Sequence, residues 1–132
     1  MKIGTLERSG GCACGTLWFI ARGEALRVGL CHCLVCQKAH GAPYFAFVVF
    51  SRSAVSLLGP HAVWESSPDY RRLYCPACGS RFANLTGVEV ELPVASFEDA
   101  SGLVPQYENW TIRRLPWIAP LAAPQFSRDR DS

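Results

Sequence analysis

Apolar residues along this chain gather in short runs that turn residues separate. Residues 16–21 are rich in β-branched and aromatic side chains and predict a strand, and residues 25–30 predict a second strand after a short turn. We expect these two strands to form a hairpin. Residues 44–50 are nearly all apolar, which fits either a strand covered on both faces or a core helix. Pro43 before this run and Ser51 after it favour the strand.

Alternating apolar and polar residues predict most of the other strands. We expect extended chain at residues 3–11, in two strands within 51–64 on either side of Gly59-Pro60, and at 70–74, 81–85, 88–97 and 107–112. One stretch, residues 33–40, predicts a helix. Gly41 is a suitable stop for it, and Pro43 prevents its continuation.

Composition agrees with a small β-rich domain. The chain has 132 residues, 49% of them hydrophobic, which is enough for one core. Its nine Pro and eleven Gly favour short strands joined by turns over long helices. No apolar run approaches the roughly 18 residues that cross a bilayer, and the first five residues lack the apolar core of a signal peptide. We therefore expect a soluble, cytoplasmic protein with no membrane partner.

Cysteine is the most informative residue type. The seven cysteines are odd in number and fall into three groups, which disfavours a secreted disulfide framework and favours metal ligation. Zinc is the expected metal; an iron–sulfur cluster is the alternative and would make the purified protein brown. The groups are Cys12 and Cys14; Cys31, Cys33 and Cys36; and Cys75 and Cys78.

Spacing within the groups predicts how the sulfur atoms meet. Cys33 and Cys36 lie three residues apart and share one face of a helical turn, and Cys31 can fold back toward them. Residues 75–79 read CPACG, a zinc knuckle in which two thiols turn back on one metal. The simplest partition joins the first and last groups into a closed site of four thiols and leaves the central three with an open position. Spacing also permits Cys12 and Cys14 to join two of the central three.

An open zinc position suggests a chemistry. Structural zinc is closed by four protein ligands, whereas reactive zinc keeps one position free. Three thiolates make zinc a weak Lewis acid that suits a soft ligand such as a thiol, and a bound thiol is deprotonated at neutral pH. Such a thiolate can add to an aldehyde carbon. Cys31, Cys33 and Cys36 are thus the candidate catalytic group.

Other residues are expected to be ordinary. The formal charge is +2. Seven thiolates with two zinc ions would lower this charge by three units, to −1, so no nucleic-acid partner is predicted. We expect His32 to point outward or to make a supporting hydrogen bond near the ligands. Arg71 and Arg72 are expected to be solvated charges, although either could bind a substrate carboxylate.

These motifs resemble the glutathione-dependent formaldehyde-activating enzyme family, which shares its domain with the centromere protein V group. The matching stretches are GCACG at 11–15, CHCLVCQK at 31–38, GAP at 41–43, YCPACGS at 74–80 and LPW at 115–117. The resemblance implies an Mss4-like fold of coiled antiparallel sheets with one short helix. It also implies that one zinc is structural and the other catalytic. The ligands would be Cys12, Cys14, Cys75 and Cys78 for the structural zinc, and Cys31, Cys33 and Cys36 for the catalytic zinc.

The resemblance also implies a reaction. Founding members join formaldehyde to glutathione, giving S-hydroxymethylglutathione, whereas many relatives have no demonstrated activity. We predict a zinc-dependent carbon–sulfur lyase acting on a small thiol and a small aldehyde, in a domain of residues 1–119 followed by a flexible tail of residues 120–132. The alternative is a non-catalytic, zinc-stabilised binding module. A basic run outside the domain would support that alternative, and the chain has none. The oligomeric state is not predicted.

Overall fold

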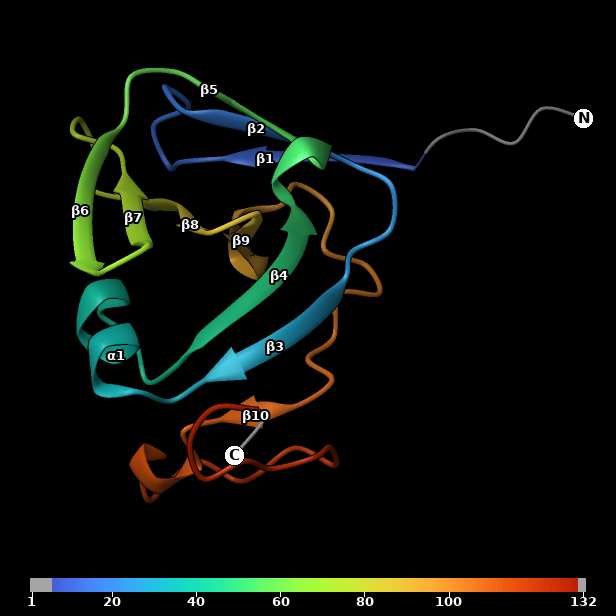
Figure 1. Cartoon of the computed structure of the whole chain (residues 1–132), viewed down its shortest axis with the longest axis vertical. Helices are drawn as coiled ribbons and strands as arrows, with labels where there is room; N and C mark the ends of the chain where they lie inside the picture. Colours follow the sequence, from blue (N-terminus) through green and yellow to red (C-terminus); the bar gives the residue numbers. More distant parts are fainter. Residues whose placement is uncertain (1–5, 131–132) are drawn as a thin grey trace, which may run out of the picture.

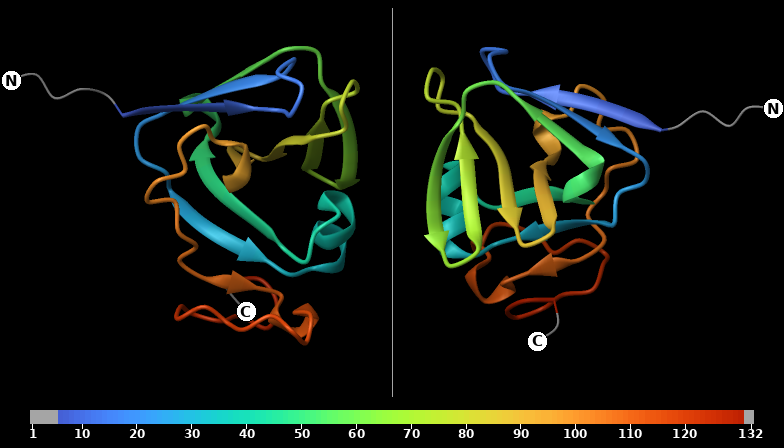
Figure 2. Two further views of the ribbon diagram at one scale, coloured as in Figure 1. Left: turned by 180° about the vertical axis from the view of Figure 1, so that it is seen from behind. Right: turned by 45° about the horizontal axis from the view of Figure 1, so that its top comes forward.

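Two β-sheets and one α-helix make up the part of the chain that the computed structural model describes, residues 6–130 (Figure 1). The large sheet has seven strands in the order β10-β3-β4-β9-β8-β7-β6, and the small sheet has three in the order β1-β2-β5. Neighbouring strands are antiparallel, except that β10 runs parallel to β3. The small sheet lies at one end of the molecule, and the segment after β10 lies at the other (Figure 2).

The elements are short, as the many turn residues predict. The strands are β1 (Glu7–Gly11), β2 (Trp18–Arg22), β3 (Arg27–Cys31), β4 (Phe45–Ser51), β5 (Val55–Leu58), β6 (Ala62–Ser67), β7 (Tyr70–Tyr74), β8 (Arg81–Thr86), β9 (Glu89–Pro93) and β10 (Glu108–Asn109). The helix is α1 (Leu34–His40), and single 3₁₀ turns lie at Arg52–Ala54, Val94–Ser96 and Thr111–Arg113. No helix in residues 6–130 has the length and apolar character needed to cross a membrane.

Strand β4 is apolar throughout because both of its faces are covered. Val48 and Phe50 lie in the larger core, between the two sheets. Phe45, Phe47 and Val49 point to the opposite face and lie in a second core beside the cysteines of α1. All five side chains are buried. The prediction of a strand covered on both faces is therefore confirmed.

The helix prediction is also confirmed. Cys33 is its N-cap, and its sulfur accepts a hydrogen bond from the backbone N–H of Cys36 at 3.2 Å. Gly41 ends it in the left-handed conformation, with φ of +57°, which a residue without a Cβ adopts without strain. One thiol of the central group thus begins the helix and a second lies on its first turn.

The predicted hairpin of residues 16–21 and 25–30 is wrong. Strand β2 pairs with β1 and β5, whereas β3 pairs with β4 and β10 in the other sheet. The preceding turn closes instead, because the N–H of Cys12 donates to the carbonyl of Leu17 at 3.1 Å. This exchange places the first pair of thiols at the tip of the β1–β2 hairpin.

Three other stretches are shorter than expected. Strand β1 begins at Glu7, and residues 3–5 lie outside the described part of the chain. Strand β9 covers only Glu89–Pro93 of the predicted 88–97, since a 3₁₀ turn follows it. The last strand, predicted at 107–112, is reduced to the two residues of β10.

Residues 121–130 lie beside β10 and run parallel to it, and we call them the C-terminal strap. The N–H of Glu108 donates to Pro124 at 3.0 Å, the N–H of Phe126 donates to Glu108 at 2.9 Å, and the N–H of Trp110 donates to Arg128 at 2.8 Å. Part of the predicted tail of residues 120–132 thus makes backbone hydrogen bonds to β10, and its flexibility stays a prediction. Because β10 is the edge strand, the strap satisfies polar groups that would otherwise be unpaired. Residues 131–132 are outside the description, and the domain boundary at 119 stays a prediction.

Candidate metal centres

Two turns from different sheets meet where the first and last of the three cysteine groups come together. One is the tip of the β1–β2 hairpin and the other joins β7 to β8. They are also linked by a hydrogen bond of 3.0 Å from the N–H of Ala13 to the hydroxyl of Ser80. Four sulfur atoms lie within 4.8 Å of one another, those of Cys12, Cys14, Cys75 and Cys78. The meeting joins chain segments about 60 residues apart, and the group could hold a metal ion.

The spacing of these sulfur atoms fits tetrahedral zinc. Four sulfurs at the usual distance of about 2.3 Å from a zinc ion lie about 3.8 Å apart. The Cys12–Cys14 and Cys14–Cys75 sulfur pairs are separated by 3.6 Å and 3.8 Å. All seven cysteines of the chain are free thiols.

Groups next to these thiols also form hydrogen bonds with two of the sulfur atoms that would bind a cation. Hydrogen bonds from the side chain and backbone of Ser80 lower the pKa of Cys78 to about 5. The N–H of Leu17 donates to the sulfur of Cys12 at 3.2 Å. Gly79 has φ of +78° and donates its N–H to the carbonyl of Cys75 at 2.8 Å, so the chain reverses within the CPACG turn. The hydrogen bonds to Cys12 and Cys78 stabilise negative charge on those two sulfurs, which a bound cation would neutralise.

The second group collects the central thiols. Cys31 ends β3, Cys33 caps α1 and Cys36 lies inside it, and their sulfurs are within 4.8 Å of one another. No further Cys, His, Asp or Glu between residues 6 and 130 joins them. Hydrogen bonds from the other two thiols lower the pKa of Cys33, whereas the bonds to its neighbours, with burial, raise the pKa of Cys31. Without a cation the three thiols thus do not all ionise together.

A cavity of about 170 Å³ opens beside the three thiols. It is smaller than the roughly 300–1,000 Å³ of a typical small-molecule site, so it can enclose only the reacting end of a larger substrate. Besides the three cysteines it is lined by Phe45, Phe47, Tyr70, Arg72, Glu91, Asn109, Trp110 and Asp129. A larger cavity of about 360 Å³ lies beside β3, but no cysteine lines it.

A row of polar residues crosses the sheet toward this cavity. Arg72 on β7 lies opposite Asn84 on β8, and Asn84 lies opposite Glu91 on β9. The hydroxyl of Tyr70 donates to Oε1 of Glu91 at 2.5 Å, and Asn84 donates to the same oxygen at 3.3 Å. Burial raises the pKa of Glu91. The row therefore brings a cation, a carboxyl group and a phenol to the wall beside the thiols.

The expectation that Arg71 and Arg72 are both solvated holds for the first and is wrong for the second. Arg71 is exposed, whereas Arg72 is only 4% exposed and lines the cavity. Adjacent residues of a strand point to opposite faces, so one of the two had to face inward. Arg72 alternates with Tyr70 and Tyr74, and this pattern was the available signal.

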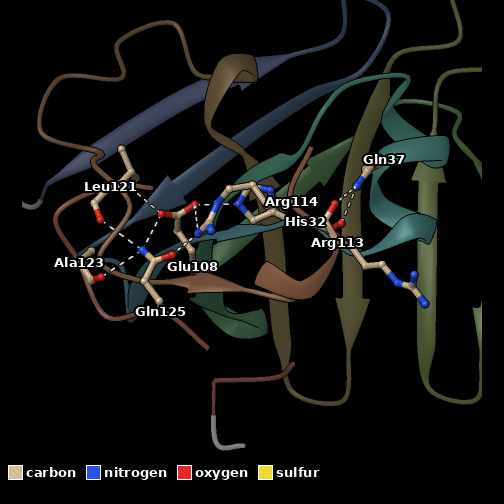
Figure 3. Close-up of polar contacts among 8 residues, drawn as sticks. All are labelled: His32, Gln37, Glu108, Arg113, Arg114, Leu121, Ala123 and Gln125. Carbon is tan, nitrogen blue, oxygen red and sulfur yellow. Dashed lines mark hydrogen bonds and ion pairs between the residues drawn. The ribbon is translucent and has the colours of Figure 1, made fainter. Parts of the chain in front are cut away.

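His32 points toward a buried carboxylate, that of Glu108 (Figure 3). Its Nε2 lies 2.7 Å from Oε1 of Glu108, and both side chains are almost fully buried. The other oxygen of Glu108 accepts hydrogen bonds from the N–H of Leu121 at 2.7 Å and the amide of Gln125 at 2.6 Å. Burial alone would raise the pKa of Glu108, but these bonds, with Arg114 nearby, lower it to about 2. An ionised Glu108 thus ties the strap to the loop of thiols.

Replacing Glu108 with alanine should lower the free energy of unfolding of the metal-loaded protein by about 3–5 kcal/mol, because the fully buried His32 would lose its partner and the strap would lose its two hydrogen bonds to the carboxylate, from Leu121 and Gln125. Denaturant unfolding measures the change. Glu98→Ala, at an exposed carboxylate, is the matched control and should change stability by less than about 0.5 kcal/mol. Equal stability of the two variants would show that the buried carboxylate does not hold the strap.

Comparison with known proteins identifies the family. The sequence profile of the family described as glutathione-dependent formaldehyde-activating enzyme matches residues 7–113. The chain belongs to that family. The match to this formaldehyde-activating enzyme family includes both cysteine groups and Arg72, so the predicted membership is confirmed. A comparison with curated proteins finds no match.

A solved structure supports the fold of this family member. A crystal structure of a Rhodobacter sphaeroides protein matches with a TM-score of 0.57 and 15% identity, over 89% of this chain and 98% of the other. At this identity the likeness concerns the fold alone. Together with the two sheets and the single helix, it confirms the predicted fold class, mainly β with one short helix.

Proposed function

We propose that this chain is a zinc-dependent carbon–sulfur lyase that forms or breaks the adduct of a small thiol and a small aldehyde. Family membership supports formaldehyde activation in general, and the family's description points to glutathione and formaldehyde as the pair. The product would be S-hydroxymethylglutathione. Seven reduced cysteines fit a reducing compartment such as the cytoplasm.

The observation behind this proposal is the difference between the two cysteine groups. One gathers four sulfurs and leaves no place for a further ligand, whereas the other gathers three beside a cavity. We assign a structural zinc to Cys12, Cys14, Cys75 and Cys78. We assign a catalytic zinc to Cys31, Cys33 and Cys36, which gives two zinc ions per chain.

A zinc ion held by the three thiols would supply a position that keeps an incoming thiol deprotonated at neutral pH. The sulfur of the substrate then adds to the aldehyde carbon, so a carbon–sulfur bond forms and the carbonyl π electrons move to oxygen. That oxygen takes up one proton, which balances the proton that the thiol lost, and the reverse sequence releases the aldehyde.

Side chains of the cavity have defined tasks in this scheme. The rings of Phe45 and Phe47 form an apolar wall that limits the access of water to the adduct. The Tyr70 hydroxyl and Oε1 of Glu91, 2.5 Å apart, hold a proton between two oxygens on the same wall. That proton can pass to the adduct oxygen while Glu91 receives the one from the thiol. The glycyl and glutamyl parts of glutathione would lie outside, because the cavity encloses only about 170 Å³.

Exchange NMR on a mixture of formaldehyde and glutathione tests the proposal. We expect zinc-loaded protein to accelerate exchange between free glutathione and the adduct in proportion to protein concentration, and metal-free protein to leave the rate unchanged. The uncatalysed rate in buffer is the reference. Absence of acceleration by the zinc-loaded protein would reject formaldehyde–glutathione chemistry and favour the alternative of a zinc-stabilised binding module.

A further inference from the structure

Arg72 is a buried cation whose hydrogen-bonding capacity is only partly used. Its side chain is 4% exposed. The Nε–H donates to the hydroxyl of Ser66 at 3.1 Å, and Nη2 lies 3.8 Å from the sulfur of Cys36. The buried Nη1 has no hydrogen-bond partner. A donor group of an always-charged residue is therefore left unsatisfied beside the three thiols.

No carboxylate forms a direct ion pair with this guanidinium. Among residues 6–130, no Asp or Glu oxygen lies within 4.0 Å of it. The carboxyl group nearest in the row, Glu91, uses its Oε1 to accept from Tyr70 and Asn84. The ring of Tyr70 adds a cation–π contact, with the guanidinium carbon 4.6 Å from the ring centre. Burying a cation without an anion is strongly unfavourable, so the sulfur atoms are the partners that the structure offers.

Charge counting shows what this cation does to ligand choice. When only the metal, its ligands and Arg72 are counted, three thiolates and one divalent ion, the group proposed above, carry a net charge of −1, which Arg72 balances. The carboxyl groups of Glu91 and Asp129 on the cavity wall are present whichever ligand enters. A neutral fourth ligand would keep the sum at zero. An anionic ligand, a thiolate above all, would bring the sum to −1 with Arg72 and to −2 without it. In a partly desolvated cavity this second unit of charge is costly, so the cation favours the anion.

We propose that Arg72 determines the ligand specificity of this site by selecting a group whose reacting atom enters as an anion, a thiolate sulfur, over a neutral nitrogen or water ligand. The inference rests on the proposed metal at Cys31, Cys33 and Cys36, but it concerns thiol binding and not aldehyde turnover.

Isothermal titration calorimetry of zinc-loaded protein tests the inference. 2-Mercaptoethanol is the anionic probe, because its sulfur is the one atom that can bring negative charge, and imidazole is the neutral probe. Titration in two buffers of different ionisation enthalpy gives the number of protons released. We expect about one proton per bound thiol for the native protein, since a bound thiol is deprotonated. We expect Arg72→Gln to lower the ratio of thiol to imidazole affinity by roughly 10- to 100-fold.

Two variants make the result specific. Arg71→Gln removes the same charge from the exposed face of the same strand and should leave the ratio within about threefold of native, since exposed charges are screened. Arg72→Lys keeps the charge without the planar fork and should retain most of the preference, which keeps the test valid if Arg72→Gln does not fold. An unchanged ratio in Arg72→Gln, or a fall in Arg72→Lys to the level expected of the glutamine variant, would overturn the proposal.

The outcomes separate this inference from the proposed function. The native protein could prefer the thiol in a way that depends on Arg72 and yet not accelerate formaldehyde–glutathione exchange. That result would reject the proposed lyase activity and retain the proposed role of Arg72 in ligand choice. If the native protein accelerates exchange but Arg72→Gln keeps the native ratio of thiol to imidazole affinity, the lyase proposal stands and the proposed role of Arg72 is rejected. A native protein that binds one zinc ion and no thiol would overturn both the proposed role of Arg72 and the second metal site.

Discussion

Cys75→Ala is expected to leave the chain largely unfolded at room temperature. Cys75 is fully buried at the point where the small and the large sheet meet, and its sulfur is one of the four that we assign to structural zinc. Structural zinc contributes on the order of 10–16 kcal/mol, as much as the entire stability of about 5–15 kcal/mol of a typical domain. Circular dichroism melting and metal analysis of the purified variant measure the loss.

Removing zinc from the native protein provides the complementary measurement. A strong chelator should abolish the cooperative melting transition of the native protein, so that the chelated protein and Cys75→Ala give the same melting curve. Both treatments remove the metal that links the two sheets. Unchanged melting together with an unchanged zinc content in Cys75→Ala would refute the structural assignment. It would also revive the partition in which Cys12 and Cys14 join two of the central thiols.

Cys36→Ala should have the opposite profile: a folded protein without activity. The thiol of Cys36 is buried in the second core, and its loss as a small side chain should cost only about 1 kcal/mol of stability. With two of three thiols left, the proposed catalytic zinc should be lost, and the acceleration of formaldehyde–glutathione exchange should fall by at least about 100-fold. Metal analysis should give one zinc ion per chain in place of two.

A conservative variant separates ligand loss from packing loss at this position. Cys36→Ser keeps the volume of the side chain but replaces a soft ligand with a weakly coordinating hydroxyl, so it should melt like the native protein and remain inactive. Full activity in Cys36→Ala or Cys36→Ser would exclude this thiol from the reaction. Unfolding of both would instead assign it a structural role like that of Cys75.

Local spacing was the most reliable guide to this protein. Cys33 and Cys36 were expected on one helical turn, and the structure has them at the cap and in the first turn of α1. The CPACG turn reverses at Gly79 as its sequence indicates. Such features depend on a few consecutive dihedral angles, which neighbouring residues restrict directly.

Features that depend on sheet faces and pairing were missed or misread. The sequence does not separate buried Arg72 from exposed Arg71, because alternation says that two neighbours face opposite sides but not which side is buried. The hairpin of β2 and β3 was wrong because each strand found its partners in a different sheet. The contacts of the strap were missed because many of them are backbone hydrogen bonds to β10, which no side-chain pattern indicates, and because the pairing of Glu108 with Gln125 joins residues of an irregular segment.

By itself the sequence determined the family, the β-rich class, the short helix and the three groups of thiols, since all of these follow from residue types and short spacings. Only the tertiary structure decided that Cys12 and Cys14 meet Cys75 and Cys78, and that Arg72 and Glu91 stand beside the remaining three. The physical reason is that contacts between distant segments depend on how two sheets bury their apolar faces together. That choice is cooperative over the whole chain and belongs to no single stretch of it.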